Sequence, residues 1–206
     1  MSDKLVTSSQ SDSVRNMAID KGVSRQQFQQ ALDNGSFSRF LDSLKLELKD
    51  IQPPKGARVR VLTVKVNQER EWQEAIDAAS TKTMVYHNVR KIGRQYPPVE
   101  MGTIEQEIIL LNFPNGGGNW DKALRWAKSK GLNRTNPREV FAIGEHNPAL
   151  HTKLGQNPMY VVATTDCTFE SNRYACSVWW YDSQRETDLC LAESFIGIFN
   201  WFAFRK

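Results

Sequence analysis

The stretch NWDKALRWAKSKGLNRTNPREVF, residues 119–141, predicts two short helices joined by a tight link. Four apolar residues recur at the i, i+3, i+4 and i+7 spacing of one helix stripe: Trp120, Ala123, Leu124 and Ala127. Gly131-Leu132 follows this stripe, and glycine is typical of the end of a helix. Residues 136–139, Asn-Pro-Arg-Glu, then supply an N-cap, a proline at the first helical position and a glutamate at the third. The local chemistry therefore predicts a helix, a Gly-Leu link and a second helix.

Strand-like runs lie on both sides of this helical pair. Five segments are rich in β-branched or aromatic residues: Arg58–Val66, Thr103–Phe113, Tyr160–Thr164, Arg173–Tyr181 and Asn200–Arg205. A short helix is expected at 72–79, where Trp72, Ala75, Ile76 and Ala79 form one stripe. We expect residues 182–199 to be a long irregular stretch, anchored by Leu189, Leu191 and Phe195, and such segments are usually functional or disordered.

These elements predict an α+β fold in which two short helices pack on a small, mostly antiparallel sheet. The main domain is expected at 57–206. Residues 1–21 lack apolar periodicity and are expected to form a flexible tail. Residues 22–52 are expected to form a helical hairpin, because Ser24 and Gln27 make a capping-box pattern and a second stripe carries Phe37, Phe40, Leu41 and Leu44.

Charge and cysteine content limit the possible partners and the compartment. The segment from Tyr160 to Lys206 has four Lys/Arg and six Asp/Glu, yet it holds 11 of the 21 aromatic residues. A nucleic-acid site normally needs a basic face, so we expect no nucleic-acid partner. The basic stretch from Lys122 to Arg138 is spaced along an amphipathic helix, which favours a solvated face. Three cysteines without Cys-x-x-Cys spacing, and no signal peptide or apolar span, indicate a cytoplasmic protein without membrane insertion.

The C-terminal half resembles the C-type-lectin-like fold, in the branch shared by formylglycine-generating enzymes and the variable proteins of diversity-generating retroelements. The resemblance covers residues 103–206 and depends on the order of its motifs. The matching motifs are Trp120-Asp121 with Ala123, Trp126-Ala127, Gly131-Leu132, residues 136–139, Arg173–Trp180, and the closing strand Trp201–Arg205. The glycine usual in the closing motif is replaced here by Asn200-Trp201, and the preceding loop is short for the family. The resemblance implies a lectin-like domain that displays a recognition surface.

Neither activity of those families is expected in this chain. Calcium-dependent sugar binding needs a Glu-Pro-Asn or Gln-Pro-Asp loop followed by Trp-Asn-Asp, whereas this chain has Gln156-Asn157-Pro158. Cys176 and Cys190 do not match the context of the formylglycine-generating cysteine pair. Glu145, His146 and His151 lack helical zinc spacing, and Gly116–Gly118 lacks the residues of a phosphate-binding loop. We therefore expect no catalytic site, no metal and no cofactor, and buried thiols at Cys167, Cys176 and Cys190.

The most favoured interpretation is a non-enzymatic binding protein, potentially diversified by a retroelement, whose ligand is a protein or a surface ligand of unknown identity. The alternatives are an uncharacterised enzyme on the same scaffold and a structural or assembly protein that uses the N-terminal hairpin; the oligomeric state stays open. We expect Leu189, Leu191, Phe202 and Phe204 to be core residues. The strand aromatics are expected to be mostly structural as well: Trp179, Trp201, Phe202 and Phe204. The expected ligand-binding surface consists of aromatic and polar residues: Trp180, Tyr181, Asp182, Ser183, Arg185, Asp188, Glu193, Ser194 and Asn200.

Overall fold

A computed structural model describes residues 14–16, 18–37, 51–81, 87–99 and 102–206. The chain divides into two compact units, Met1–Ile51 and Gln52–Lys206. None of the helices within these described ranges is long and apolar enough to cross a membrane. The second unit, with its mixture of helices and strands, contains every residue of the expected recognition surface.

In the first unit, α2 (Arg25–Asp33) begins as the sequence predicts. The Ser24 hydroxyl accepts from the Gln27 amide at 3.2 Å, and the Gln27 side chain accepts from the Ser24 amide at 2.9 Å. The rings of Phe28 and Phe37 lie 5.8 Å apart. Residues 14–16 and 18–20 are helical where a tail was expected. The rest of the predicted second helix, with Phe40, Leu41 and Leu44, lies outside the described residues.

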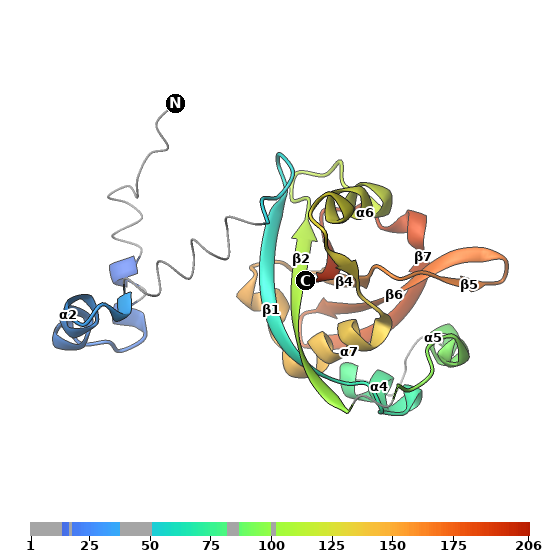
Figure 1. Cartoon of the computed structure of the whole chain (residues 1–206), viewed down its shortest axis with the longest axis horizontal. Coiled ribbons are helices and arrows are strands. Elements are labelled where there is room, and N and C mark those ends of the chain that lie inside the picture. Colours follow the sequence, from blue (N-terminus) through green and yellow to red (C-terminus); the bar gives the residue numbers. More distant parts are fainter. Residues whose placement is uncertain (1–13, 17, 38–50, 82–86, 100–101) are drawn as a thin grey trace. The chain divides into compact units, whose positions relative to one another are not determined.

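The second unit combines helices with an eight-stranded sheet (Figure 1). Its helices are α4 (Trp72–Ala79), α5 (His87–Lys91), η1 (Gly93–Gln95), α6 (Trp120–Ser129), α7 (Pro137–His146), α8 (Leu150–Lys153) and η2 (Ala192–Ser194). Its strands are β1 (Arg58–Asn67), β2 (Thr103–Asn112), β3 (Asn133–Arg134), β4 (Met159–Ala163), β5 (Cys167–Phe169), β6 (Asn172–Tyr181), β7 (Gln184–Leu191) and β8 (Asn200–Arg205). The helix pair at 119–146 and the five predicted strands are confirmed.

The sheet is mostly antiparallel, and the last strand of the chain lies near its middle. The strand order is β1-β2-β8-β4-β6-β5, while β3 pairs with β8 and β7 pairs with β6. Among the strands that the structure describes, only β4 and β8 pair in parallel. A central strand is covered on both faces, which explains why the closing run Trp201–Phe204 is fully apolar and buried.

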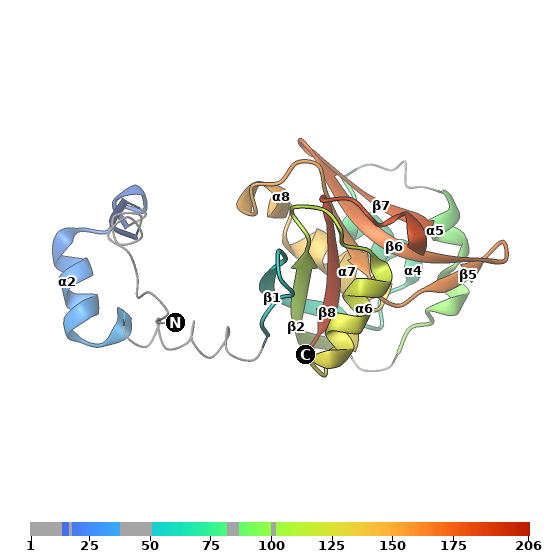
Figure 2. The same ribbon diagram turned by 90° about the horizontal axis from the view of Figure 1, so that it is seen from above.

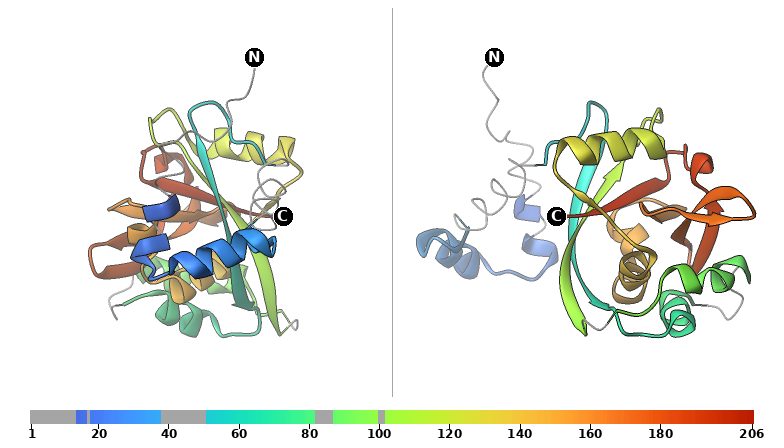
Figure 3. Two further views of the ribbon diagram at one scale, coloured as in Figure 1. Left: turned by 90° about the vertical axis from the view of Figure 1, so that its left-hand side faces the viewer. Right: turned by 45° about the vertical axis from the view of Figure 1, so that its right-hand side comes forward.

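The two faces of β8 meet different helices, because successive side chains of a strand point in opposite directions. Phe202 and Phe204 pack against α6, with ring centroids 6.4 Å from Trp120 and 6.0 Å from Trp126. Trp201 and Ala203 belong to the core formed with the buried residues of α7. Figure 2 shows β8 passing between α7 and α6, and the right-hand view of Figure 3 shows α6 lying across one side of the sheet.

Both α6 and α7 begin at the predicted positions, each with a side-chain N-cap. The Asn119 side chain accepts from the Lys122 amide at 2.8 Å, so the preceding glycines lead into an N-cap. Gly118 must be glycine, since a Cβ there would lie 2.0 Å from the Phe113 ring. Asn136 accepts from the Glu139 amide at 3.1 Å, and Glu139 accepts from the Asn136 amide at 2.6 Å, which completes the predicted capping box.

The prediction of an irregular stretch at 182–199 is wrong for residues 184–191. Residues 184–191 form β7, which pairs with β6 along its whole length after the two-residue turn Asp182-Ser183. The segment after α4 covers part of the outer edge of β7: the Thr81 amide donates to the Arg185 carbonyl at 2.7 Å, and the Thr187 amide to the Ser80 hydroxyl at 3.2 Å. The run QRETDLCL has little intrinsic strand preference, so pairing in the folded state decides its conformation.

Glu139 provides a pH-dependent prediction. Its side chain is fully buried, accepts from Nη1 of Arg205 at 3.3 Å, and burial raises its pKa above the ordinary value. The Glu139 carboxylate therefore binds a proton at a higher pH in the folded protein than in the unfolded chain. Protonation of Glu139 thus adds to the free energy of unfolding, and this contribution increases as the pH falls toward 4.5, the ordinary pKa of a glutamate. We expect the wild type to gain stability relative to Glu139→Gln over this range. Urea unfolding of both proteins at several pH values measures this difference in stability. A constant difference between wild type and variant across the pH range would contradict the prediction.

Candidate functional site

Three aromatic rings form a row on the second unit, here called the aromatic face: Tyr160, Trp179 and Tyr181. Tyr160 on β4 lies opposite Trp179 on β6, and their ring centroids are 6.3 Å apart with an interplanar angle of 29°. Trp179 and Tyr181 are two residues apart on β6, so both point to the same side of the sheet, with centroids 6.5 Å apart. Tyr181 is 49% exposed, whereas the other two rings are partly buried.

The turn next to the aromatic face is held in one conformation. Asp182 has a left-handed backbone with φ of 52°, which suits the first position of a two-residue hairpin. The Asn157 side chain donates to Oδ1 of Asp182 at 2.7 Å and accepts from the Asp182 amide at 3.1 Å. These two bonds tie the β6–β7 turn to the segment before β4, so the edge of the aromatic face is preorganised.

A second group of exposed apolar side chains lies in the segment that joins η2 to β8: Ile196, Ile198 and Phe199. The backbone of this segment is firmly held. The Ile198 carbonyl accepts from Asn112 and from Gln156, both at 2.7 Å, and the Phe199 carbonyl accepts from the Tyr160 amide at 2.9 Å. The last bond joins the backbone of residue 199 to that of Tyr160, the first residue of the aromatic face. The segment therefore exposes apolar side chains on a fixed backbone.

Five of the nine expected recognition residues are exposed. Tyr181, Asp182 and Ser183 lie together at the β6–β7 turn. Glu193 and Ser194 lie in η2, where Nη2 of Arg173 pairs with Glu193 at 2.8 Å and the Ser194 hydroxyl donates to the Leu191 carbonyl at 2.6 Å. A hydrogen bond with its own backbone amide lowers the pKa of the Glu193 carboxyl, and the hydrogen bond from Arg173 lowers it further. Glu193 thus contributes to holding η2 in place.

The other four expected recognition residues are buried, which corrects the prediction that they face solvent. Trp180 is in the core on the opposite side of β6. Arg185 donates from Nε to the Ala79 carbonyl at 2.6 Å, at the C-terminal end of α4. Asp188 accepts from the Leu189 amide and from the Cys190 thiol. Asn200 donates to the Gly197 carbonyl at 3.3 Å. The polar groups of Arg185, Asp188 and Asn200 therefore bond to backbone and thiol partners inside the fold.

Sequence reasoning assigned two neighbouring tryptophans to the wrong faces. Trp179 was expected to be structural and Trp180 to be exposed, whereas the structure shows the reverse. Alternation along the strand indicates that Trp179 and Trp180 point to opposite faces of the sheet. Because helices pack on both faces, alternation does not indicate which of the two side chains is buried. Tyr160 and Phe199 were missed for the same reason. Leu191, expected in the core, is 41% exposed at the end of β7, whereas Leu189, Phe202 and Phe204 are buried as predicted.

The thiols are poorly suited to nucleophilic chemistry. Cys167 and Cys176 are buried and Cys190 is partly buried. Burial raises the pKa of all three thiols, and together with the neighbouring Asp188 carboxylate it raises the pKa of Cys190 to about 12. The reactive form of cysteine is the thiolate, so at neutral pH these groups stay protonated. The prediction of buried thiols is confirmed for Cys167 and Cys176.

The polar residues near the end of α7 have structural partners. The Glu145 carboxylate accepts two bonds from Arg70, at 2.6 and 3.1 Å, and this hydrogen bonding raises the pKa of Arg70. Nε2 of His146 lies 3.0 Å from the Lys65 carbonyl. Within the described parts of the chain, no three His, Cys, Asp or Glu side chains are grouped as metal ligands.

Comparisons of the chain with protein-family models, with curated protein sequences and with solved structures found no match.

Proposed function

We propose that this chain is a non-enzymatic binding protein that recognises a protein or surface ligand through the aromatic face. The observation that carries this proposal is the row of Tyr160, Trp179 and Tyr181, whose rings lie side by side on β4 and β6. Tryptophan and tyrosine are enriched at the energetic centres of protein interfaces.

The surroundings of the aromatic face support the same proposal. Polar side chains at the adjoining turn, Asp182 and Ser183, provide the rim that interfaces usually have. Aromatic side chains on paired strands lose little conformational entropy on binding, because their backbone and ring positions are already restricted. Burying one such side chain contributes about 1.5–3 kcal/mol. The aromatic face could therefore hold a partner without a large rearrangement.

The proposed class is a lectin-like recognition domain. It is supported by the order β2, α6, Gly-Leu link, α7, strands and closing aromatic strand β8. Diversification by a retroelement is part of the same proposal, although four of the nine candidate positions are buried. The genomic test is direct: an adjacent reverse transcriptase gene and a near-copy of the final codons differing at adenines would support diversification, and their absence would remove it.

The test is a double variant of the full chain, Trp179→Ala with Tyr181→Ala. We expect it to melt within a few degrees of the wild type, because both side chains are partly or largely exposed. Partner capture from host lysate or cell surface should fall at least about tenfold, as expected when central aromatic residues of an interface are truncated. Lys130→Ala with Lys153→Ala, at two exposed positions on other elements, is the control. Unchanged capture by a normally folded double variant would place recognition elsewhere.

A second candidate function, assembly through the Met1–Ile51 unit, is favoured by its exposed apolar side chains. Helix α2 has no buried residue, and Ile19, Val23 and Leu32 are 60%, 39% and 42% exposed. A helix of nine residues is marginally stable alone in water and gains stability by packing on a partner. Light scattering of the full chain and of Val23→Asp with Leu32→Asp tests this: a larger species that the variant loses supports assembly, and a monomer in both proteins contradicts it.

A further inference from the structure

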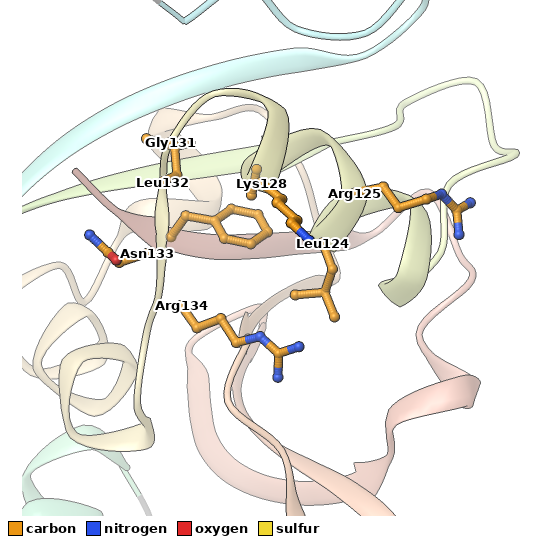
Figure 4. A pocket seen from close by; sticks show the side chains of 9 residues that line it. Leu124, Arg125, Lys128, Gly131, Leu132, Asn133 and Arg134 are labelled. Carbon is orange, nitrogen blue, oxygen red and sulfur yellow. The ribbon is translucent and has the colours of Figure 1, made fainter.

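A hollow of about 510 Å³ lies between α6 and β3, at the end of the sheet away from the aromatic face. Tyr160 is opposite Asn200 at the start of β8, whereas the hollow reaches Phe204 near its end. Apolar atoms of Leu124, Leu132 and Phe204 line it, together with the cationic side chains of Arg125, Lys128 and Arg134 (Figure 4). The hollow is therefore an apolar depression with positive charge around it.

The positive charge is not balanced by nearby residues in the sequence. Residues 122–138 contain six Lys/Arg and no Asp or Glu. Arg134 pairs with Asp166 at 2.9 Å, but within the described ranges neither Arg125 nor Lys128 pairs with a carboxylate. Both of these side chains are exposed. The spacing that predicts a solvated basic face thus coincides, in the folded protein, with a concave surface.

The link that follows α6 shapes this surface. Gly131 has a left-handed backbone with φ of 68°, and the Leu132 amide donates back to the Ala127 carbonyl at 3.0 Å, so the chain turns sharply at the end of the helix. The turn brings Leu132 and Arg134 opposite the side chains of α6. Figure 4 shows Leu124 and Lys128 projecting from the helix, with Arg134 across from them.

We propose that this hollow binds an acidic segment of a partner protein, with one apolar side chain seated on Leu124 and Leu132 and carboxylates beside Lys128 and Arg134. Charge complementarity favours an acidic ligand. The apolar lining favours one that also carries a hydrocarbon side chain. The cations come from three positions around the hollow, an arrangement suited to several carboxylates along a peptide. A lone phosphate would be held better by donors that converge on one point.

The two parts of the proposed contact have separate signatures. Burying a leucine side chain is expected to strengthen binding about tenfold or more. Ion pairs at an exposed site are individually weak and screened by salt, so the affinity should also fall as the ionic strength rises. A ligand that lacks either the apolar side chain or the negative charges should therefore bind poorly.

The experiment uses the full chain, labelled with ¹⁵N, and the capped peptide Asp-Glu-Leu-Glu-Asp as the probe. We expect its titration to shift amide resonances of α6, β3 and their link, and we expect the peptide with serine in place of leucine to bind about tenfold more weakly. Arg125→Glu with Lys128→Glu should weaken the leucine peptide about tenfold, because attraction becomes repulsion at two positions. Lys130→Glu with Lys153→Glu makes the same change in net charge outside the hollow and should leave affinity unchanged.

Several results would overturn the proposal. These are no shifts at about 1 mM leucine peptide, equal binding of the serine peptide, or equal weakening by the control variant. Tighter binding of inorganic phosphate or of an oligothymidine strand than of the leucine peptide would assign the hollow to phosphate instead. Melting curves establish that each variant is folded. Loss of partner capture by the aromatic-face variant does not affect this outcome, since the two surfaces share no residue.

Discussion

Replacing Trp180 with alanine is expected to lower the free energy of unfolding by about 3–5 kcal/mol, the range for removing a large aromatic side chain from a core. Trp180 is completely buried in the same cluster as Val178 and Trp201. Domains of this kind are stable by only about 5–15 kcal/mol, so the variant should be largely unfolded at modest denaturant concentrations. Urea unfolding followed by circular dichroism measures the change.

Trp179→Ala is the matched control, because it removes the same side chain at the adjacent position on β6. Its ring is partly exposed on the other face, so we expect a cost of about 1 kcal/mol or less. Trp180→Phe should also be mild, since it keeps most of the apolar ring and removes an indole N–H that has no hydrogen-bond partner among the described residues. Equal destabilisation by Trp179→Ala and Trp180→Ala would contradict the assignment of faces.

Replacing Arg138 with alanine is expected to lower the free energy of unfolding by about 2–4 kcal/mol, because two partly buried carbonyl groups lose a charged donor. Arg138 is 4% exposed. Its guanidinium donates to the carbonyls of Arg70 and Tyr96, the latter at 2.9 Å, and lies 5.7 Å from the centre of the Trp72 ring. It therefore joins α7 to the segments that precede α4 and follow η1. Chemical denaturation of the full chain measures the loss.

Two further variants make this prediction specific. Arg138→Lys keeps the charge but lacks the planar fork that reaches both carbonyls, so we expect it to recover less than half of the loss. Arg125→Ala, which removes an exposed arginine from α6, should change stability by about 0.5 kcal/mol or less. A full recovery by lysine would show that charge alone matters at position 138.

The helix starts were predictable because their signals are local. The capping groups of α2, α6 and α7 bond to amides three residues further along the chain. The stripe at 72–79 was predictable for a similar reason: Trp72, Ala75, Ile76 and Ala79 are all buried on one side of α4. These features depend on residue types at short spacing, and that spacing is visible in the sequence.

The same local reasoning failed where distant segments provide the interactions. β7 is a strand because β6 lies beside it and because residues 80–81 bond to its edge, about a hundred residues away in the sequence. Arg185 is buried because it reaches the end of α4, although an arginine in a polar run normally indicates solvent. The residues of the run 182–199 alone indicate neither the pairing of β7 nor the contact between Arg185 and α4.

The sequence by itself determined the starts of α2, α6 and α7, the buried stripe of α4 and the five strand-like segments, because these depend on caps and periodicity within a few residues. Only the tertiary structure decided which side of β6 would be covered, and therefore that Trp180 lies in the core while Trp179 joins the aromatic face. It also decided that the basic face of α6 borders a hollow, because the Gly131 turn brings Arg134 opposite the helix. Alternation in a strand specifies that neighbouring side chains point to opposite faces, and only packing against distant elements specifies which face is buried.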